Sequence, residues 1–170
     1  YNDIILRCVA QALRDCPYMN AVMTENAIIQ KGSVNIGMAV ATDAGLLVPV
    51  NKNADRLSLK GIAGASADLA SRVKENRLNP DELEGGTFTV SNLGMYDVDH
   101  FTAIINAPEA GILAVGKLQK QPVVLPDDTI AVRPMMQLTL TYDHRVVDGA
   151  PAAVFLKRIK TLLECPALML

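Results

Sequence analysis

The sequence is poor in the residues that mark several kinds of functional site. Its 170 residues include no tryptophan, two histidines and three cysteines, and aromatic residues make up only 4%. Two distant histidines and cysteines without CxxC spacing match no zinc-binding pattern, so we predict no metal site. Cys8 and Cys16 share one face of a helical pattern. Together with Cys165 they are predicted to be buried free thiols of a reducing compartment.

Long apolar runs and blocks of like charge are also missing. No apolar stretch approaches the roughly 20 residues that a membrane-spanning helix needs. The net charge is −2 and the chain has no run of Lys or Arg, which argues against nucleic-acid binding. No glycine-rich phosphate-binding loop occurs, and the first residues lack the layout of a signal peptide. We therefore expect neither a membrane nor a nucleic acid as a partner.

What is present is an aliphatic chain long enough for one folded domain. Half of the residues are hydrophobic, which suffices for a sizeable core and for surface that contacts other subunits. The spacing of apolar residues predicts three helices, over residues 3–16, 59–77 and 152–163. The first should stop before Pro17, Ser58 can cap the second, and Pro151 suits the first turn of the third.

Extended segments fill much of the remaining chain. Strands are predicted within residues 27–50, with a turn at 43–45, and within residues 87–92. Further short candidates occupy residues 103–106, 111–116, 123–125 and 130–142, the last interrupted around Pro134. Helices and strands mixed along one chain without an internal repeat predict a single α/β domain, a mixed sheet with packed helices.

His144 stands in the most informative chemical context. It follows a predicted strand in Thr139–Gly149, TLTYDHRVVDG. A neutral imidazole accepts a proton near neutral pH, which suits a general base acting on a hydroxyl or a thiol. Asp148 can fix the loop through an ion pair or orient the imidazole, and Gly149 permits a sharp turn into the last helix. The alternative is a structural histidine packed beneath that helix.

Ser91 is the second candidate, in the stretch GGTFTVSNLGM. A short hydroxyl at the end of a strand can donate a hydrogen bond to an oxyanion. Alternatively, Ser91 and Asn92 simply form a turn. The Val-Ser-Asn-Leu-Gly context is not the G-x-S-x-G elbow of a hydrolase, so nothing identifies Ser91 as a nucleophile. His100, between acids and an aromatic residue, is predicted to be a surface or interface residue.

Several stretches carry a resemblance to a known family. The motif DHRVVDG resembles the H-x-x-x-D-G signature of dihydrolipoamide acyltransferases, chloramphenicol acetyltransferases and peptide-synthetase condensation domains. VNIGMAVATDAGLLVPV, LEGGTFTVSNLGMYDVDHFTAIINAPEAGILAVGK and LLECPALML are similar to the dihydrolipoamide acyltransferases, the core components of 2-oxo-acid dehydrogenase complexes. The resemblance covers almost the whole chain, and its SNLGMY version is similar to the acetyl-transferring branch that serves pyruvate or acetoin.

The resemblance implies a chloramphenicol-acetyltransferase-like fold and a trimer with active sites between neighbouring subunits. His144 would then be the base for the thiol of coenzyme A or dihydrolipoamide, and Ser91 of another subunit would stabilise the oxyanion. Asp148 would hold the loop and the subunit contact, with Asn92 and Gly149 in support. A non-catalytic core subunit and a chloramphenicol-type acetyltransferase are the alternatives.

A larger assembly is implied as well. Residues 1–170 would be the catalytic domain without its N-terminal arm, with the lipoyl and peripheral-subunit-binding domains outside this chain. Trimers would build a cubic or dodecahedral core through the apolar tail at 166–170, although that tail can instead fold back on its own domain. The core would bind the decarboxylase and dihydrolipoamide dehydrogenase components, in a bacterial cytoplasm or a mitochondrial matrix.

Overall fold

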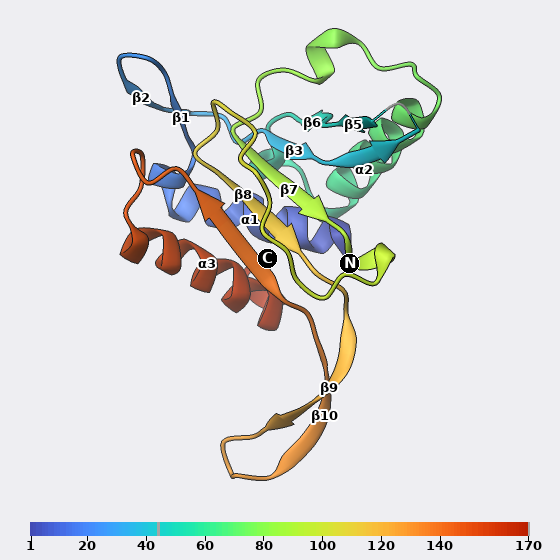
Figure 1. Ribbon diagram of the computed structural model, residues 1–170, viewed down its shortest axis with the longest axis vertical. Coiled ribbons are helices and arrows are strands. Elements are labelled where there is room, and N and C mark those ends of the chain that lie inside the picture. Colours follow the sequence, from blue (N-terminus) through green and yellow to red (C-terminus); the bar gives the residue numbers. More distant parts are fainter. Residues whose placement is uncertain (44, 170) are drawn as a thin grey trace.

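The computed structural model describes residues 1–43 and 45–169, and its centre is a five-stranded mixed sheet (Figure 1). The strand order is β11-β8-β7-β3-β6. Strand β7 runs parallel to β3 and β8, whereas β11 and β6 are antiparallel to their neighbours. The bounds are β3 Ile36–Met38, β6 Val50–Asn51, β7 Phe88–Asn92, β8 Gly111–Val115 and β11 Leu138–Tyr142. The predicted mixed sheet with packed helices is confirmed.

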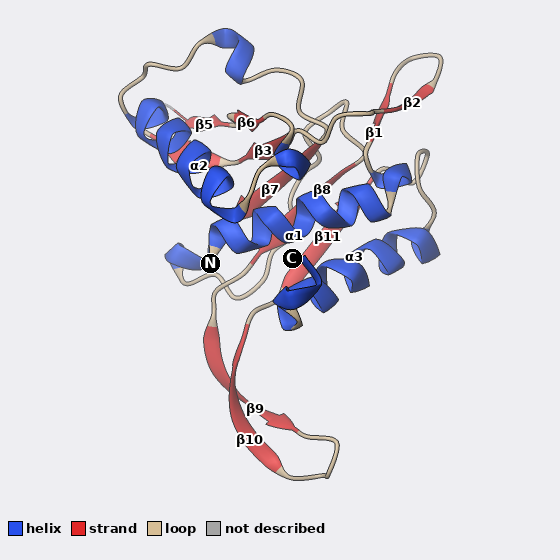
Figure 2. Ribbon diagram, turned by 180° about the vertical axis from the view of Figure 1, so that it is seen from behind, coloured by secondary structure: helices blue, strands red, loops and turns tan. Residues whose placement is uncertain are grey.

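Three helices cover one face of this sheet, with α1 between α2 and α3 (Figure 2). Their bounds are α1 Asn2–Asp15, α2 Leu59–Lys74 and α3 Gly149–Glu164. Helix α1 ends before Pro17, and the Ser58 hydroxyl accepts a hydrogen bond from the Gly61 amide at 3.1 Å, as a helix cap. Helix α2 ends three residues earlier than predicted, because Asn76 takes a left-handed backbone conformation.

The alternation of side chains along β7 explains which residues enter the core. Phe88 and Val90 point to the helices, and the Phe88 ring meets Phe155 of α3 edge-on with 5.4 Å between centroids. Because successive strand residues point to opposite faces, Thr89 and Ser91 lie on the face away from the helices. The strand therefore holds Ser91 rigidly without placing it in the hydrophobic core.

Three two-stranded hairpins surround the sheet. They are β1 Ala21–Met23 with β2 Ile28–Gln30, β4 Val40–Thr42 with β5 Gly45–Leu47, and β9 Gln119–Val124 with β10 Ile130–Met135. The β9–β10 ribbon projects away from the body (Figure 1). Pro134 pairs with Lys120 inside this ribbon, so the break predicted at Pro134 falls instead at residues 136–137, between β10 and β11. Short 3-10 turns are η1 Pro17–Met19, η2 Ala54–Arg56, η3 Pro80–Glu82, η4 Gly94–Tyr96 and η5 Pro166–Met169.

Two sequence predictions about burial and strand formation are wrong. Residues 103–106 form a loop, and Ile104 is 91% exposed. The sheet has its edges at β11 and β6, and residues 103–106 pair with neither. Cys165 is exposed at the end of α3, whereas Cys8 and Cys16 are buried as predicted.

Candidate functional site

Ser91 lies one residue before the end of β7, with its backbone paired to Ala114 of β8. It lines a cavity of about 510 Å³ together with residues of α1, α2, β4 and η4. Exposed apolar side chains, among them Leu46, Met95 and Tyr96, surround this cavity. Ser91 is thus held by a central strand at the wall of a largely apolar cavity, the kind of place where ligands bind.

The turn after Ser91 is fixed by hydrogen bonds. The Asn92 side-chain oxygen accepts from the Gly94 amide at 2.9 Å, and its side-chain nitrogen donates to Asn2 Oδ1 at 3.3 Å. The Leu93 amide donates to the Val115 carbonyl at 3.1 Å. Asn92 thus orders this turn and ties it to the start of α1.

Asp99 fixes the next loop to the base of the β9–β10 ribbon, where β9 begins and β10 ends. Its carboxylate accepts from Gln119 Nε2 at 2.8 Å and from Gln137 Nε2 at 3.1 Å. A side chain on Gly116 would collide with the Asp99 carbonyl oxygen, so this close approach requires glycine. His100 is exposed, with Nδ1 at 3.5 Å from Asp99 Oδ2, and is a surface residue of the chain.

His144 lies at the other end of the sheet, in the loop between β11 and α3, with 69% of its side chain exposed. The backbone of this loop is tightly bonded. The Asp143 amide donates to the Ala110 carbonyl at 2.9 Å, and the Asp143 carbonyl accepts from the amides of Val146 and Val147. Val147 is buried and anchors the loop to the core.

An ion pair within the loop was missed by sequence reasoning. Arg145 reaches both carboxylate oxygens of Asp143, with Nε at 2.9 Å from Oδ1 and Nη2 at 2.6 Å from Oδ2. The hydrogen bonds from Arg145 hold the pKa of Asp143 below its ordinary value. The sequence feature that could have predicted this pair is an acid and an arginine two residues apart, just after a strand. The acid that holds the loop within one chain is therefore Asp143.

Asp148 and Gly149 follow His144 at the start of α3. Asp148 Oδ1 is 3.8 Å from His144 Nδ1, too far for a hydrogen bond, and its side chain is 84% exposed. Gly149 begins α3 and its backbone is not left-handed, so the turn into the helix does not by itself require glycine. A Cβ there would lie 3.3 Å from Tyr142 Oη, a tight contact that the phenol would relieve by a shift of a few tenths of an ångström.

The sheet keeps Ser91 and His144 apart within one chain. Ser91 pairs with Ala114 of β8, whereas the Asp143 amide bonds to Ala110, which lies four residues earlier and directly precedes β8. At about 3.3 Å per residue this is about 13 Å along the sheet, and β7 and β11 are about 10 Å apart across β8. Figure 1 shows the arrows of β7 and β11 pointing in opposite directions. One chain therefore presents Ser91 and His144 at separate places on the sheet.

The C-terminal tail folds back on its own domain as far as it is described. In η5, Met169 packs against the core and its sulfur lies 3.4 Å from the Cys8 thiol of α1. Leu168 in the same turn stays 50% exposed. The predicted docking segment also included Leu170, which lies outside the described residues.

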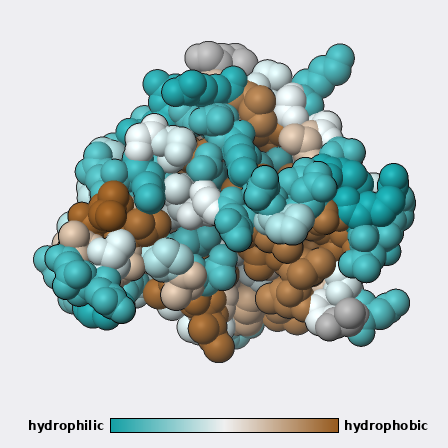
Figure 3. Space-filling view, turned by 90° about the horizontal axis from the view of Figure 1, so that it is seen from above, coloured by the Kyte–Doolittle hydropathy of each residue, from teal (hydrophilic) through white to brown (hydrophobic). Residues whose placement is uncertain are grey.

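Figure 3 shows apolar patches among hydrophilic side chains on the face of the molecule that is seen from above.

Within residues 1–43 and 45–169, no helix is long and apolar enough to cross a membrane. No group of three or more His, Cys, Asp or Glu side chains in that part of the chain is placed to hold a metal ion.

The fold is that of chloramphenicol acetyltransferase. A structure of that enzyme superposes with a TM-score of 0.60 at 14% identity, over 95% of this chain and 76% of that chain. The family profile of the 2-oxoacid dehydrogenases acyltransferase (catalytic domain) matches residues 1–170. The chain belongs to this family.

Relatives within the family serve different complexes. The chain is 47% identical to the dihydrolipoyllysine-residue acetyltransferase component of the mitochondrial pyruvate dehydrogenase complex of Schizosaccharomyces pombe, over 97% of this chain and 35% of that protein. It is 46% identical to the lipoamide acyltransferase component of the branched-chain alpha-keto acid dehydrogenase complex of Bacillus subtilis, over 94% and 38%. The chain thus spans little more than a third of these relatives.

Solved structures agree with the family assignment. The cubic core of a pyruvate dehydrogenase multienzyme complex has a TM-score of 0.94 at 40% identity, over 98% of this chain and 69% of that chain. The dihydrolipoamide acetyltransferase of Azotobacter vinelandii gives the same TM-score, identity and coverage. That structure belongs to an investigation of a serine, a histidine and an asparagine in the catalytic mechanism of the Azotobacter enzyme.

Proposed function

We propose that this domain transfers an acetyl group between a dihydrolipoyl thiol and coenzyme A in the core of a 2-oxoacid dehydrogenase complex. The observation that carries the proposal is the pair of half-sites at opposite ends of one sheet. Each chain offers a fixed hydroxyl, Ser91, and an exposed imidazole, His144, which only neighbouring chains can bring together. A trimer with three such sites between subunits meets this requirement.

The residue types of the Azotobacter enzyme support the assignment. The histidine and the asparagine investigated there are four positions apart. His144 and Asp148 have the same spacing, with aspartate in place of asparagine. Because the Asp148 side chain is 84% exposed within one chain, we assign it to the contact with the neighbouring subunit rather than to the reacting atoms.

The chemical step begins with His144 as general base. Its imidazole takes the proton of the attacking thiol, whose ordinary pKa of about 8.5 leaves little thiolate at neutral pH. The thiolate attacks the carbonyl carbon of the acetyl thioester, and the carbonyl electron pair moves to oxygen. Collapse of the tetrahedral intermediate re-forms the carbonyl and expels the second thiolate, which recovers the proton from the imidazolium of His144.

Ser91 stabilises the negative charge that develops on the carbonyl oxygen. Its hydroxyl is short, sits on a central strand and is followed by the turn that Asn92 orders. A donor that is already oriented needs no reorganisation when the charge appears, which is the basis of oxyanion stabilisation.

Acetyl is the acyl group we assign, with pyruvate or acetoin as the parent substrate. The SNLGMY and FTAIINAPEAGILAVG stretches support it, because they resemble the acetyl-transferring branch. Branched-chain and succinyl-transferring relatives at 46% and 43% identity are the competing classes. Rates with acetyl-, succinyl- and isobutyryl-coenzyme A decide between them.

We further propose that the trimers form a cubic or dodecahedral core that binds the decarboxylase and dihydrolipoamide dehydrogenase components. An apolar cavity of about 520 Å³ between α3 and the base of the β9–β10 ribbon is suited to the tail of a neighbouring trimer. Its lining includes Leu118, Met135, Leu156 and Leu163. The bacterial cytoplasm and the mitochondrial matrix, where such complexes work, are the proposed locations.

The test is acetyl transfer from acetyl-coenzyme A to dihydrolipoamide, with variants mixed as well as measured alone. His144→Ala should lose about 10²–10⁴ in rate and Ser91→Ala about 10²–10³. His100→Ala, the matched control on the surface, should keep wild-type turnover. When the two inactive variants are unfolded together and reassembled in equal amounts, roughly a quarter of the intersubunit sites regain both groups in a cyclic trimer.

The mixing result separates the possibilities. Recovery of about a quarter of wild-type activity supports a site shared between chains. No recovery from a correctly assembled mixture rejects the shared site. An assembled wild-type protein that transfers no acyl group would instead be a structural core subunit.

A further inference from the structure

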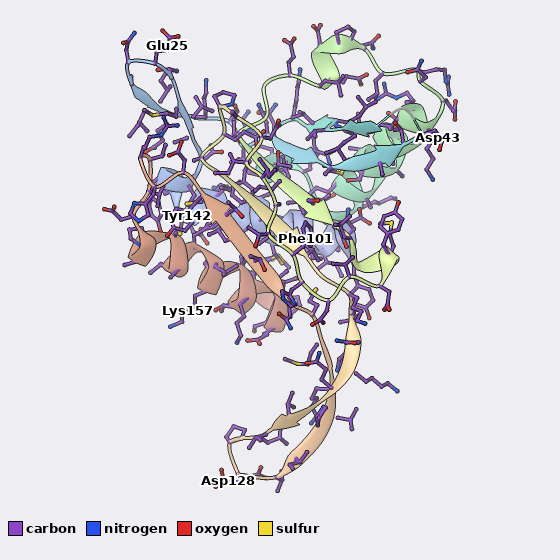
Figure 4. All side chains as sticks on the ribbon, viewed as in Figure 1. Glu25, Asp43, Phe101, Asp128, Tyr142 and Lys157 are labelled. Atoms are coloured by element: carbon purple, nitrogen blue, oxygen red, sulfur yellow. The ribbon has the colours of Figure 1, made fainter. Side chains whose placement is uncertain are left out.

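We propose that Tyr142 is the positioning residue of His144, and that the missing side chain of Gly149 makes room for it. This inference rests on the proposed function, because it concerns the base of that reaction. Tyr142 ends β11, where its backbone pairs with Gly111. Its ring lies 5.7 Å from the imidazole of His144, with the two planes inclined by 37°. Figure 4 shows Tyr142 at the end of the strand nearest the start of α3.

The side chain of His144 needs such a neighbour. The backbone of its loop is fixed by Asp143 and Arg145, but those bonds leave the two side-chain torsions of the histidine free. Two contacts of the imidazole stand out, the ring of Tyr142 and the carboxylate of Asp148, and Asp148 at 3.8 Å is too distant for a hydrogen bond. The inclined aromatic contact is therefore what selects the direction in which the imidazole points.

Gly149 sets the place of the tyrosine ring. A Cβ on Gly149 would lie 3.3 Å from Tyr142 Oη, closer than an ordinary van der Waals contact. The start of α3 cannot easily move away, because Tyr18 Oη donates to the Pro151 carbonyl at 3.1 Å and Ala152 is buried. A side chain at Gly149 would thus displace the phenol, and with it the face against which His144 rests.

A double-mutant cycle tests this chain of contacts. A misplacement of about 1 Å can cost about a hundredfold in rate, so Gly149→Ala should lower kcat about threefold, at unchanged KM. Alanine is the better helix former, so the unfolding midpoint of that variant should not fall. Tyr142→Phe keeps the ring and removes the oxygen, and should stay within about twofold of wild type.

The decisive measurement is the combination. Gly149→Ala together with Tyr142→Phe should regain the activity of Tyr142→Phe alone, because the colliding oxygen is gone. If Gly149 had only a structural role, Gly149→Ala would lower kcat by the same factor in wild type and in Tyr142→Phe. An equal loss in both, or no loss in either, overturns the proposal.

Removal of the ring gives a readout that does not depend on activity. In crystal structures, Tyr142→Leu should show the His144 imidazole in a different or a divided orientation, whereas Tyr142→Phe should keep the wild-type one. Tyr142→Met replaces the leucine variant if that protein fails to fold. An unchanged imidazole in the ring-free variant overturns the positioning role. If wild-type protein transfers no acyl group, or His144→Ala retains transfer, the proposed function fails while these structures still decide the positioning question.

Discussion

Glu109 is a buried acid whose ionisation should make the fold less stable as the pH rises. It is only 3% exposed, and its carboxyl accepts hydrogen bonds from Thr89 Oγ1 at 2.6 Å and from Asn106 Nδ2 at 3.3 Å. Burial raises the pKa of Glu109 to about 7, although the bonds from Thr89 and Asn106 oppose this. No cationic side chain among the described residues pairs with it, so desolvation prevails.

The magnitude follows from linkage between proton binding and folding. The pKa rises from an ordinary value of 4.5 to about 7 in the folded chain. At about 1.4 kcal/mol per pH unit, the difference is about 3 kcal/mol. Because the folded pKa lies above the unfolded one, this stability is fully present below pH 4.5 and is lost progressively up to about pH 7. Above that pH no further loss is expected.

Urea unfolding of wild type and Glu109→Gln between pH 4 and 8 measures this effect. The amide has nearly the same shape and stays neutral, so the variant should gain about 3 kcal/mol relative to wild type across that range. Protein concentration is held constant because assembly contributes to stability. Glu84 and Glu109 line the same hollow, but Glu84 is exposed, so the control Glu84→Gln should change stability by the same amount at every pH. A constant difference between wild type and Glu109→Gln from pH 4 to 8 would refute the reasoning.

Three further outcomes are expected. Hydrogen bonds from Arg72 lower the pKa of Glu82 to about 2, so the stability advantage of wild type over Glu82→Gln in urea should shrink as pH falls from 5 towards 2. Asp143→Asn weakens the pair with Arg145 and should lower kcat about tenfold at unchanged KM in steady-state assays. Tyr18→Phe loses its bond to the start of α3 and should cost about 1 kcal/mol in urea unfolding. A stability difference for Glu82→Gln that is the same at every pH would contradict the first. An unchanged kcat of Asp143→Asn would contradict the second, and an unchanged urea midpoint of Tyr18→Phe the third.

The helices and the central strands could be predicted because their signals are local. The apolar stripe that contains Cys8 and Cys16 defines α1, and the alternation around Ser91 defines β7. Residues 103–106 carry the same kind of apolar run, yet form no strand. Whether an apolar run becomes a strand depends on a free sheet edge, and that depends on the order in which distant segments pair.

The candidate site also contains residues that local sequence predicts and contacts that it does not predict. His144 and Ser91 were identified from chemical context and from resemblance, which act through neighbouring residues in the sequence. The contact of Tyr142 with Gly149 and the burial of Glu109 arise where a strand end meets a helix start or a second strand. Such contacts have no local pattern, so the reason for glycine at 149 was assigned to a turn rather than to a close approach.

The exposure of His144 becomes understandable if the site is built from two chains, as proposed. A base that must reach a substrate held by a neighbour cannot be buried by its own chain, so few contacts of its own are expected. Such a residue has to be oriented from its own side alone, by the loop backbone and by Tyr142 behind it. Ser91, in contrast, is held by a central strand and needs no such support. Dilution that separates the subunits should therefore abolish transfer before it unfolds the chain, a difference that activity and circular dichroism on one dilution series would reveal.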